Sequence, residues 1–229
     1  MAVCSALGQG TFRNLDFELA NVPALPQGQY GSLNGVLAAD AIPYWSVFYG
    51  SYQTPMITYN NYTLGNANVS ILGPHWDGNL GTMILEGNYT AVLQAGQWNA
   101  TVSTSIAQTG TIPADTRSLQ LRINPFGGYA LGISFAGREL PVSILVERSP
   151  YDLTVGCDLS DYAGQSGELR LTALSYPNFR FASFGVDSIV FSSQAIAEPH
   201  TVYIILTGCL AYLYFHHRRP TGTKAVPFI

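Results

Sequence analysis

The sequence predicts an all-β protein whose body is one sandwich of short strands. Apolar and polar residues alternate with a period of two, so that Leu119, Leu121 and Ile123 share one face, and residues 167–174 repeat the pattern. Gly, Asn, Pro and Asp separate such segments, and residues 11–193 contain no long window with the 3.6-residue apolar period of a helix. Many short strands between turns are typical of a sandwich or barrel.

The individual strands are predicted from the same alternation. They are expected at residues 44–51, 55–60, 67–72, 82–86, 89–94, 100–109, 117–124, 129–135, 142–147, 167–174, 179–184 and 186–192. No linker or repeat interrupts this series, so we expect one domain over residues 9–193.

The composition is typical of an extracellular β-protein. Only 10% of the residues are charged, Lys224 is the single lysine, and 14 residues are tyrosine. Seven arginines oppose thirteen acidic residues up to residue 197, whereas three basic residues oppose one acidic residue after it. An acidic body excludes nucleic acid as a partner, because phosphate binding needs clustered cations.

The two ends of the chain predict export and membrane attachment. Residues 1–8 fit the remnant of a signal peptide, with a flexible apolar terminus as the alternative. Residues 200–217 are expected to form a transmembrane helix, since the uncharged stretch 200–215 would span about 24 Å. The cations of the tail, residues 218–229, place it inside and the body outside; the alternative is a buried terminal element of a soluble domain.

This C-terminus resembles the PEP-CTERM sorting signal of bacterial exosortase substrates. The linker, residues 194–199, carries Ala197-Glu198-Pro199 in place of Pro-Glu-Pro, and Arg218-Arg219 follows the apolar segment. Ten further residues follow the arginines, where family members usually stop sooner. The resemblance implies recognition and processing by an exosortase, a location at the cell surface or outer envelope, and an extracellular polysaccharide as partner.

Three phrases of the body resemble the jelly rolls of galactose-binding-domain-like proteins. They are Asn14-Leu15-Asp16-Phe17-Glu18 at the start, Asp158-Leu159-Ser160-Asp161-Tyr162-Ala163-Gly164-Gln165 before a late strand, and Gly185-Val186-Asp187-Ser188-Ile189-Val190-Phe191 at the end. The resemblance implies an opening strand at residues 14–18 and a structural Ca²⁺ ion bound by Glu18 and Asp187. Ser188 replaces a second Asp, which removes one ligand. The alternative is that backbone amides satisfy these strand-end carboxylates.

Tryptophans are the candidates for stacking on sugar rings. His75, Trp76, Asp77 and Asn79 combine a ring with polar side chains in a glycine-flanked loop, where binding residues tend to lie. We expect these four residues to bind carbohydrate, and Trp45 to belong to the core instead.

Catalytic motifs are absent from the sequence. It contains no Gly-x-Ser-x-Gly elbow, His-Glu-x-x-His helix or phosphate loop, and His75 is the only histidine before His200. We therefore expect no catalytic residue, and a non-catalytic exported surface protein that interacts with polysaccharide or matrix. The alternative is a small glycoside hydrolase or lyase on the same fold. Two carboxylates across a cleft would favour the enzyme, whereas a shallow aromatic face would favour binding.

Overall fold

The computed structural model describes residues 9–22, 35–63, 65–74, 76, 83–96, 102–127, 130–175 and 182–196. The chain divides into two compact units, Met1–Ile196 and Ala197–Ile229, and the second lies outside the described residues. The predictions for the signal remnant, the sorting motif, the membrane helix and the basic tail fall on residues outside this description. Within the described residues, no helix is long and apolar enough to cross a membrane.

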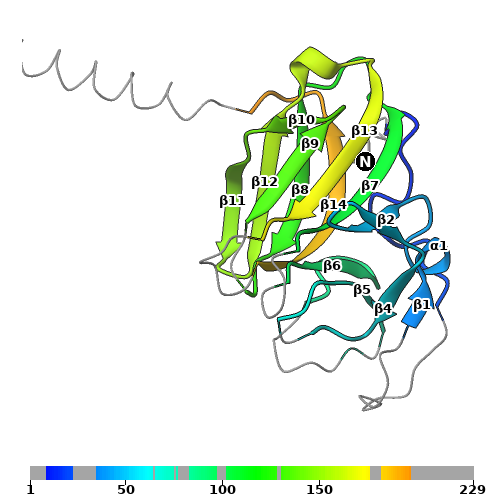
Figure 1. Cartoon of the computed structure of the whole chain (residues 1–229). Coiled ribbons are helices and arrows are strands. Elements are labelled where there is room, and N and C mark those ends of the chain that lie inside the picture. Colours follow the sequence, from blue (N-terminus) through cyan, green and yellow to red (C-terminus); the bar gives the residue numbers. More distant parts are fainter. Residues whose placement is uncertain are drawn as a thin grey trace, which may run out of the picture. The chain divides into compact units, whose positions relative to one another are not determined.

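The body is a sandwich of two β-sheets, which confirms the predicted all-β architecture (Figure 1). In spatial order, the eight-stranded sheet contains β1 (Gly35–Leu37), β4 (Met56–Tyr59), β5 (Asn68–Leu72), β6 (Thr90–Gln94), β14 (Ser183–Ser192), β8 (Ser118–Asn124), β12 (Asp152–Asp158) and β11 (Ser143–Ser149). The six-stranded sheet contains β10 (Arg138–Leu140), β9 (Leu131–Phe135), β13 (Ser166–Ala173), β7 (Thr104–Thr111), β2 (Ser46–Tyr49) and β3 (Tyr52–Thr54).

The central strands alternate between the two sheets along the chain. Strands β6, β8, β12 and β14 belong to one sheet and β7, β9 and β13 to the other, and β8 pairs with both β12 and β14. All strand pairs are antiparallel except β4 with β5. This antiparallel wrapping from sheet to sheet is the connectivity of a jelly roll.

The core lies between the inner faces that the alternation predicts. Leu119, Leu121 and Ile123 of β8 are all buried, and across the sandwich Leu171 of β13 lies beside Ile106 of β7. Full burial of each such side chain stabilises the fold by about 1.5–3 kcal/mol. The side chains of the intervening positions therefore face outward, where a binding surface can form.

The opening segment differs from its prediction. Residues 14–18 form turns rather than a strand, and Asn14 has a φ of 50°. The Glu18 amide donates to Asp16 Oδ1 (3.4 Å), and just outside this segment the amides of Arg13 and Leu19 also bond to side chains, to Gln108 Oε1 (2.7 Å) and Asn14 Oδ1 (3.0 Å). The indole of Trp45 donates to the carbonyl of Asn14 (3.0 Å) and packs on Phe17, with 5.8 Å between ring centroids. Trp45 is 4% exposed, so its predicted place in the core is confirmed.

Several predicted strand limits are wrong. Residues 83–86 form no strand, because the amides of Leu85 and Glu86 bond to side chains of β6 and β14. The two strands predicted before and after Gly185 are one strand, β14, with a bulge beyond Asp187. Strands β1, β3, β10 and β12 and the four-residue helix α1 (Ala38–Ala41) were not predicted. Three of these strands have only three residues, too few to show an alternation.

Candidate functional site

Trp76 lies in the loop that follows β5. It is half-buried, and its backbone amide donates to the carbonyl of Gly73 (3.0 Å), which forms a turn at the strand end. Of the four residues predicted to bind carbohydrate, Trp76 is the one that the structure describes; His75, Asp77 and Asn79 lie outside the described residues.

A small apolar cluster on the outer face of the eight-stranded sheet supports Trp76. Leu72 of β5 and Val92 of β6 alternate with residues of the main core, so their side chains point to the opposite face, where they pack with Met83. Trp76, Ile84 and Phe126 cover this cluster and are themselves partly exposed. Trp76 therefore packs on buried apolar side chains, and part of its surface remains accessible.

Three partly exposed aromatic rings meet at this place. The ring of Tyr62 contacts Trp76 edge-on with 5.7 Å between centroids, and it contacts Phe126 in the same manner at 6.1 Å. Such edge-to-face pairs hold the rings in fixed relative orientations. We call Tyr62, Trp76 and Phe126 the aromatic cluster.

Two buried polar atoms beside the aromatic cluster have no hydrogen-bond partner in the described part of the chain. One is the indole Nε1 of Trp76, a donor, and the other is Oδ1 of Asn124, an acceptor on a residue that is 2% exposed. The carbonyl of Asn124 accepts a bond from the amide of Phe126 (3.1 Å), which places it at the cluster. A buried polar group without a partner costs about 1–3 kcal/mol. A hydroxyl group, which both donates and accepts, has the chemistry to satisfy such atoms.

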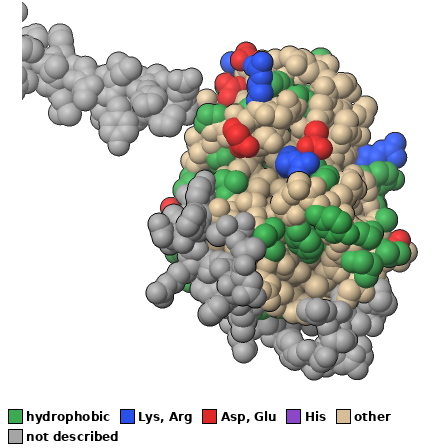
Figure 2. Space-filling view, in the orientation of Figure 1, with side chains coloured by type: hydrophobic (Ala, Val, Ile, Leu, Met, Phe, Trp, Pro, Cys, Tyr) green, Lys and Arg blue, Asp and Glu red, His purple; other side chains and the backbone are tan. Residues whose placement is uncertain are grey.

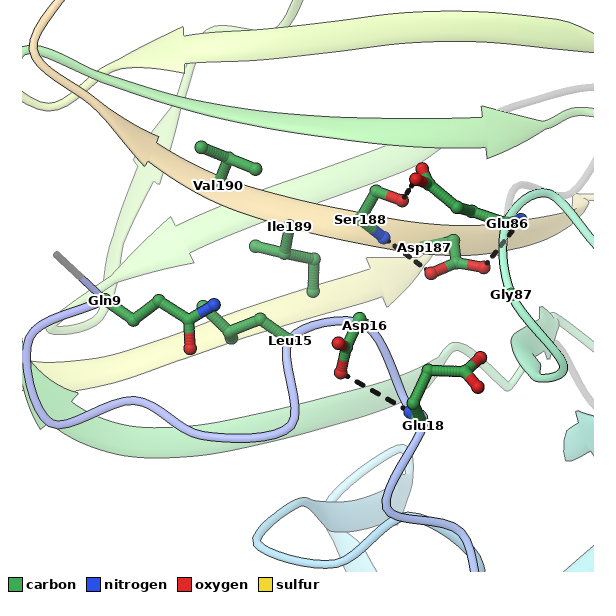
Figure 3. A pocket seen from close by; sticks show the side chains of 10 residues that line it. All are labelled: Gln9, Leu15, Asp16, Glu18, Glu86, Gly87, Asp187, Ser188, Ile189 and Val190. Atoms are coloured by element: carbon green, nitrogen blue, oxygen red, sulfur yellow. Dashed lines mark hydrogen bonds between the residues drawn. The ribbon is translucent and has the colours of Figure 1, made fainter. Parts of the chain in front are cut away.

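A second feature is an acidic cleft of about 410 Å³ where the N-terminal segment meets β14 (Figure 3). Its lining includes the carboxylates of Asp16, Glu18, Glu86 and Asp187, together with Ser188. The structure thus places Glu18 and Asp187, the two predicted calcium ligands, in one cleft, although 169 positions separate them in the sequence.

Asp187 is a buried carboxyl group held by three donors. Its Oδ2 accepts bonds from the Thr90 hydroxyl (2.7 Å) and the Glu86 amide (3.3 Å), and its Oδ1 accepts one from the Ser188 amide (2.7 Å). Burial raises the pKa of Asp187 to about 7, and the negative charge of Glu18 adds to this effect, while the three donors oppose it. Ser188, at a φ of 49°, marks the bulge of β14 and donates its hydroxyl to Glu86 Oε2 (2.7 Å).

Asp187 binds one end of the loop 86–89, and Glu18 binds the other end. Its Oε1 accepts bonds from the amides of Asn88 (2.8 Å) and Tyr89 (2.9 Å), and its Oε2 accepts one from Asn88 Nδ2 (3.0 Å). Gly87 lies between these two sets of hydrogen bonds and has a φ of 61°. A Cβ at this position would come within 2.4 Å of Glu18 Oε1. Only glycine allows the loop to approach the carboxylate this closely.

The carboxyl groups of Glu18 and Asp187, the two predicted Ca²⁺ ligands, are both engaged by protein donors. Each of their four oxygens already accepts at least one hydrogen bond, so positive N–H or O–H dipoles face the carboxylates. Across the described residues, no group of three or more His, Cys, Asp or Glu side chains is arranged to hold a metal ion. Ca²⁺ needs six to eight oxygen ligands. The contacts match the alternative expectation, in which backbone amides satisfy both carboxylates.

Calcium binding stays open to a direct measurement. Because protein donors occupy the carboxylate oxygens, we expect the melting temperature to be the same in millimolar Ca²⁺ as in chelator. A site occupied at a hundredfold excess over Kd would instead raise the free energy of unfolding by about 2.7 kcal/mol. Such a rise, lost in Glu18→Gln, would show that Ca²⁺ displaces the loop amides.

Sequence reasoning missed several residues of both features. Glu86 and Thr90 lie on either side of the turn signal Gly87-Asn88, between the strands predicted at 82–86 and 89–94, but nothing in the sequence linked them to Asp187. Tyr62, like Tyr59 and Tyr89, was a weaker candidate for sugar stacking from the sequence, whereas Phe126 and Asn124 carry no such signal, because their approach to Trp76 depends on how distant loops pack.

No family model and no curated protein sequence matches the chain. Among solved structures, the Stig cyclase Fisc from Fischerella sp. TAU is 15% identical over 80% of this chain and 96% of its own, with a TM-score of 0.46. TmCBM61 in complex with beta-1,4-galactotriose is 12% identical over 82% of this chain and all of its own (100%), with a TM-score of 0.45. The match to the enzymatically active domain of bacteriophage CBA120 tailspike protein 4 covers 76% of this chain and 21% of that chain, at 14% identity and a TM-score of 0.33. All three are too distant to assign a function to this chain.

Proposed function

We propose that the body is a non-catalytic glycan-binding domain and that the aromatic cluster contacts an extracellular polysaccharide. The observation that carries this proposal is the aromatic cluster, in which the partly exposed ring of Tyr62 contacts both Trp76 and Phe126 edge-on. The C–H face of a sugar ring packs on such rings.

The surface of the body supports a polar, uncharged ligand. Figure 2 shows a face covered mainly by uncharged side chains, with few basic and acidic groups between them. Three of the four arginines in the described strands pair with acids: Arg122 with Asp152 at 2.9 Å, Arg148 with Asp152 at 3.2 Å and Arg170 with Glu168 at 2.9 Å. Hydroxyl and amide groups thus remain as the main surface chemistry, which suits hydrogen bonding to sugar hydroxyls.

The acidic cleft favours a second candidate, a small glycosidase. It holds several carboxylates, and Asp187, with its pKa raised to about 7, has the protonation behaviour of a general acid. However, Asp187 is fully buried, and both its oxygens are engaged by the loop that it holds. Both oxygens of Glu18 are engaged as well. These contacts support a structural role for the carboxylates, and binding is the function that we propose.

We also propose that the protein is exported and attached through its C-terminus, with an exosortase as processing partner. The support is the uncharged stretch 200–215, followed by Arg218 and Arg219 and preceded by Ala197-Glu198-Pro199. A reporter active only in the periplasm should work when fused after Ser193 and fail when fused after Thr223. Activity from the second fusion but not from the first would contradict this topology.

Trp76→Ala tests the binding function. Loss of an aromatic contact costs on the order of 1–3 kcal/mol, so affinity should fall about tenfold or more. The measurement is retardation in native gels that contain hydroxyethylcellulose, dextran or alginate. Tyr151→Ala, which removes an exposed ring from the turn between β11 and β12, is the matched control and should migrate like the wild type. Equal retardation of Trp76→Ala and wild type, or no retardation of the wild type in any gel, would refute the proposal.

A further inference from the structure

A second cleft, of about 440 Å³, lies on the six-stranded sheet and is built wholly from described residues. Its walls include Tyr44, Ser46 of β2, Gln53 of β3 and the apolar side chains of Leu37 and Pro55. No residue that lines it carries a charge. Its lining therefore offers an occupant apolar and hydrogen-bonding contacts.

Tyr44 is an exposed aromatic ring on a strained backbone. Its side chain is 54% exposed, although its φ of 73° lies in the left-handed region that favours glycine. Such outliers persist only where the surrounding structure enforces them, and they cluster at ligand-binding sites.

The residues on both sides of Tyr44 enforce this conformation. Asn14 Nδ2 donates to the carbonyl of Pro43 (3.1 Å), and the indole of Trp45 donates to the carbonyl of Asn14 (3.0 Å). The guanidinium of Arg13 stacks on the Tyr44 ring at 5.2 Å and donates to its hydroxyl at 3.4 Å. The ring is thus held outward in a fixed position, although the core gains nothing from it.

The cleft also contains hydrogen-bonding side chains. Gln53 Nε2 donates to Ser46 Oγ (3.3 Å), which orients the amide and leaves Gln53 Oε1 without a hydrogen bond from the described part of the chain. An oriented amide beside a fixed tyrosine ring offers hydrogen bonds to sugar hydroxyls and a platform for the C–H face of the ring.

The two aromatic sites face opposite sides of the sandwich. Trp76 covers the outer face of β5 and β6 in the eight-stranded sheet. Gln53 lies opposite Phe48 in the register of β2 and β3, one position away from the buried Val47, so it faces outward from the six-stranded sheet.

We propose that the Tyr44 cleft is a second site for neutral polysaccharide, which makes the domain bivalent and able to cross-link polysaccharide chains. This inference rests on the proposed glycan-binding function. Two sites on opposite faces cannot easily bind one short segment of polysaccharide. They therefore bind different segments of one polysaccharide molecule or two different polysaccharide molecules. Binding to polymers then gains from avidity, because the second contact forms at a high effective concentration.

The test compares wild type, Tyr44→Ala, Gln53→Ala, Trp76→Ala and the Tyr44→Ala/Trp76→Ala double variant. Retardation is measured in hydroxyethylcellulose, dextran and alginate gels, and cross-linking is measured as the light scattering of protein mixed with each polymer. Each single variant should bind a neutral polymer about tenfold more weakly and should abolish the scattering. The double variant should not bind, and Tyr151→Ala should behave as wild type in both measurements.

Each contrary outcome refutes a different claim. If Tyr44→Ala and Gln53→Ala bind and scatter as wild type, the second site is wrong and the proposed function stands. If Trp76→Ala alone abolishes all binding, the second site is wrong as well. If Tyr44→Ala alone abolishes binding, the proposed site at Trp76 fails and the Tyr44 cleft remains. Self-association that Tyr44→Ala removes, in a protein that binds no polymer, would show that a second copy of the chain occupies the cleft.

Discussion

Replacement of Trp45 by alanine should lower the free energy of unfolding by about 3–5 kcal/mol, the usual cost of removing a buried aromatic side chain. Trp45 packs against Phe17 and donates to the carbonyl of Asn14, so the change also leaves a buried acceptor unsatisfied. Since many domains are stable by only about 5–15 kcal/mol, the variant should be largely or partly unfolded at moderate temperature. Urea unfolding followed by circular dichroism measures the change.

Trp45→Phe is the matched control for this prediction. Phenylalanine keeps a ring beside Phe17 and removes the hydrogen bond to Asn14, so the loss should be clearly smaller than for alanine. Trp76→Ala should keep the fold, because Trp76 lies on an outer face and is only half-buried. A Trp45→Ala protein that is as stable as Trp76→Ala would show that the N-terminal segment does not depend on the indole.

The stability of the protein should fall as the pH rises from about 4 to about 7 because of Asp187. Its pKa is about 7 in the folded protein, against an ordinary value of 3.8, so the folded state binds the proton more tightly than the unfolded chain. The stabilisation is complete below the ordinary pKa and is lost as the pH passes through the folded pKa. A shift of this size corresponds to a change on the order of 4 kcal/mol.

The difference between wild type and Asp187→Asn isolates this group from other titrations. Asp158, whose pKa is lowered mainly by its bond from the Ser160 amide, acts in the opposite direction in both proteins and cancels. Glu18 and Glu86, the acids nearest to Asp187, and Arg122 beside Glu86 are also common to both. Urea unfolding at pH 4, 5.5, 7 and 8 should show the wild type losing stability relative to Asp187→Asn with rising pH. A difference that is constant, or that changes in the other direction, would mean that Asp187 is ionised in the folded protein.

The sequence predicted those parts of the fold that follow from local alternation. Strands β5, β6, β8 and β13 were placed to within one or two residues, because each has one face in the core. The strand that the jelly-roll resemblance implied at residues 14–18 was wrong, since this segment forms turns in which the Glu18 amide bonds to the Asp16 side chain. Whether such a segment forms a strand depends on the hydrogen-bond partners of its backbone, and the tertiary structure determines those partners.

The candidate sites were predictable to different extents. Glu18 belongs to the phrase that opens the jelly roll and Asp187 to the phrase that closes it, and the structure places both in one cleft. Backbone amides as their partners were the alternative expectation, but which amides these are was not predictable, since they belong to the loop that carries Glu86. Tyr44 was hidden for another reason: its exposure and its left-handed φ follow from the way Asn14 fixes Pro43, a contact between distant residues.

The central claim is that a polysaccharide rests on Trp76, and the fluorescence of that indole tests it most directly. In the variant Trp45→Phe/Trp98→Phe, Trp76 is the only tryptophan, so the emission reports on this ring alone. Titration with the polysaccharide that retards the wild type should shift the emission to shorter wavelength, because the sugar replaces water at the indole, and the shift should saturate as binding does. If the variant binds the polysaccharide and the Trp76 emission stays unchanged at saturation, the aromatic cluster is not the binding site.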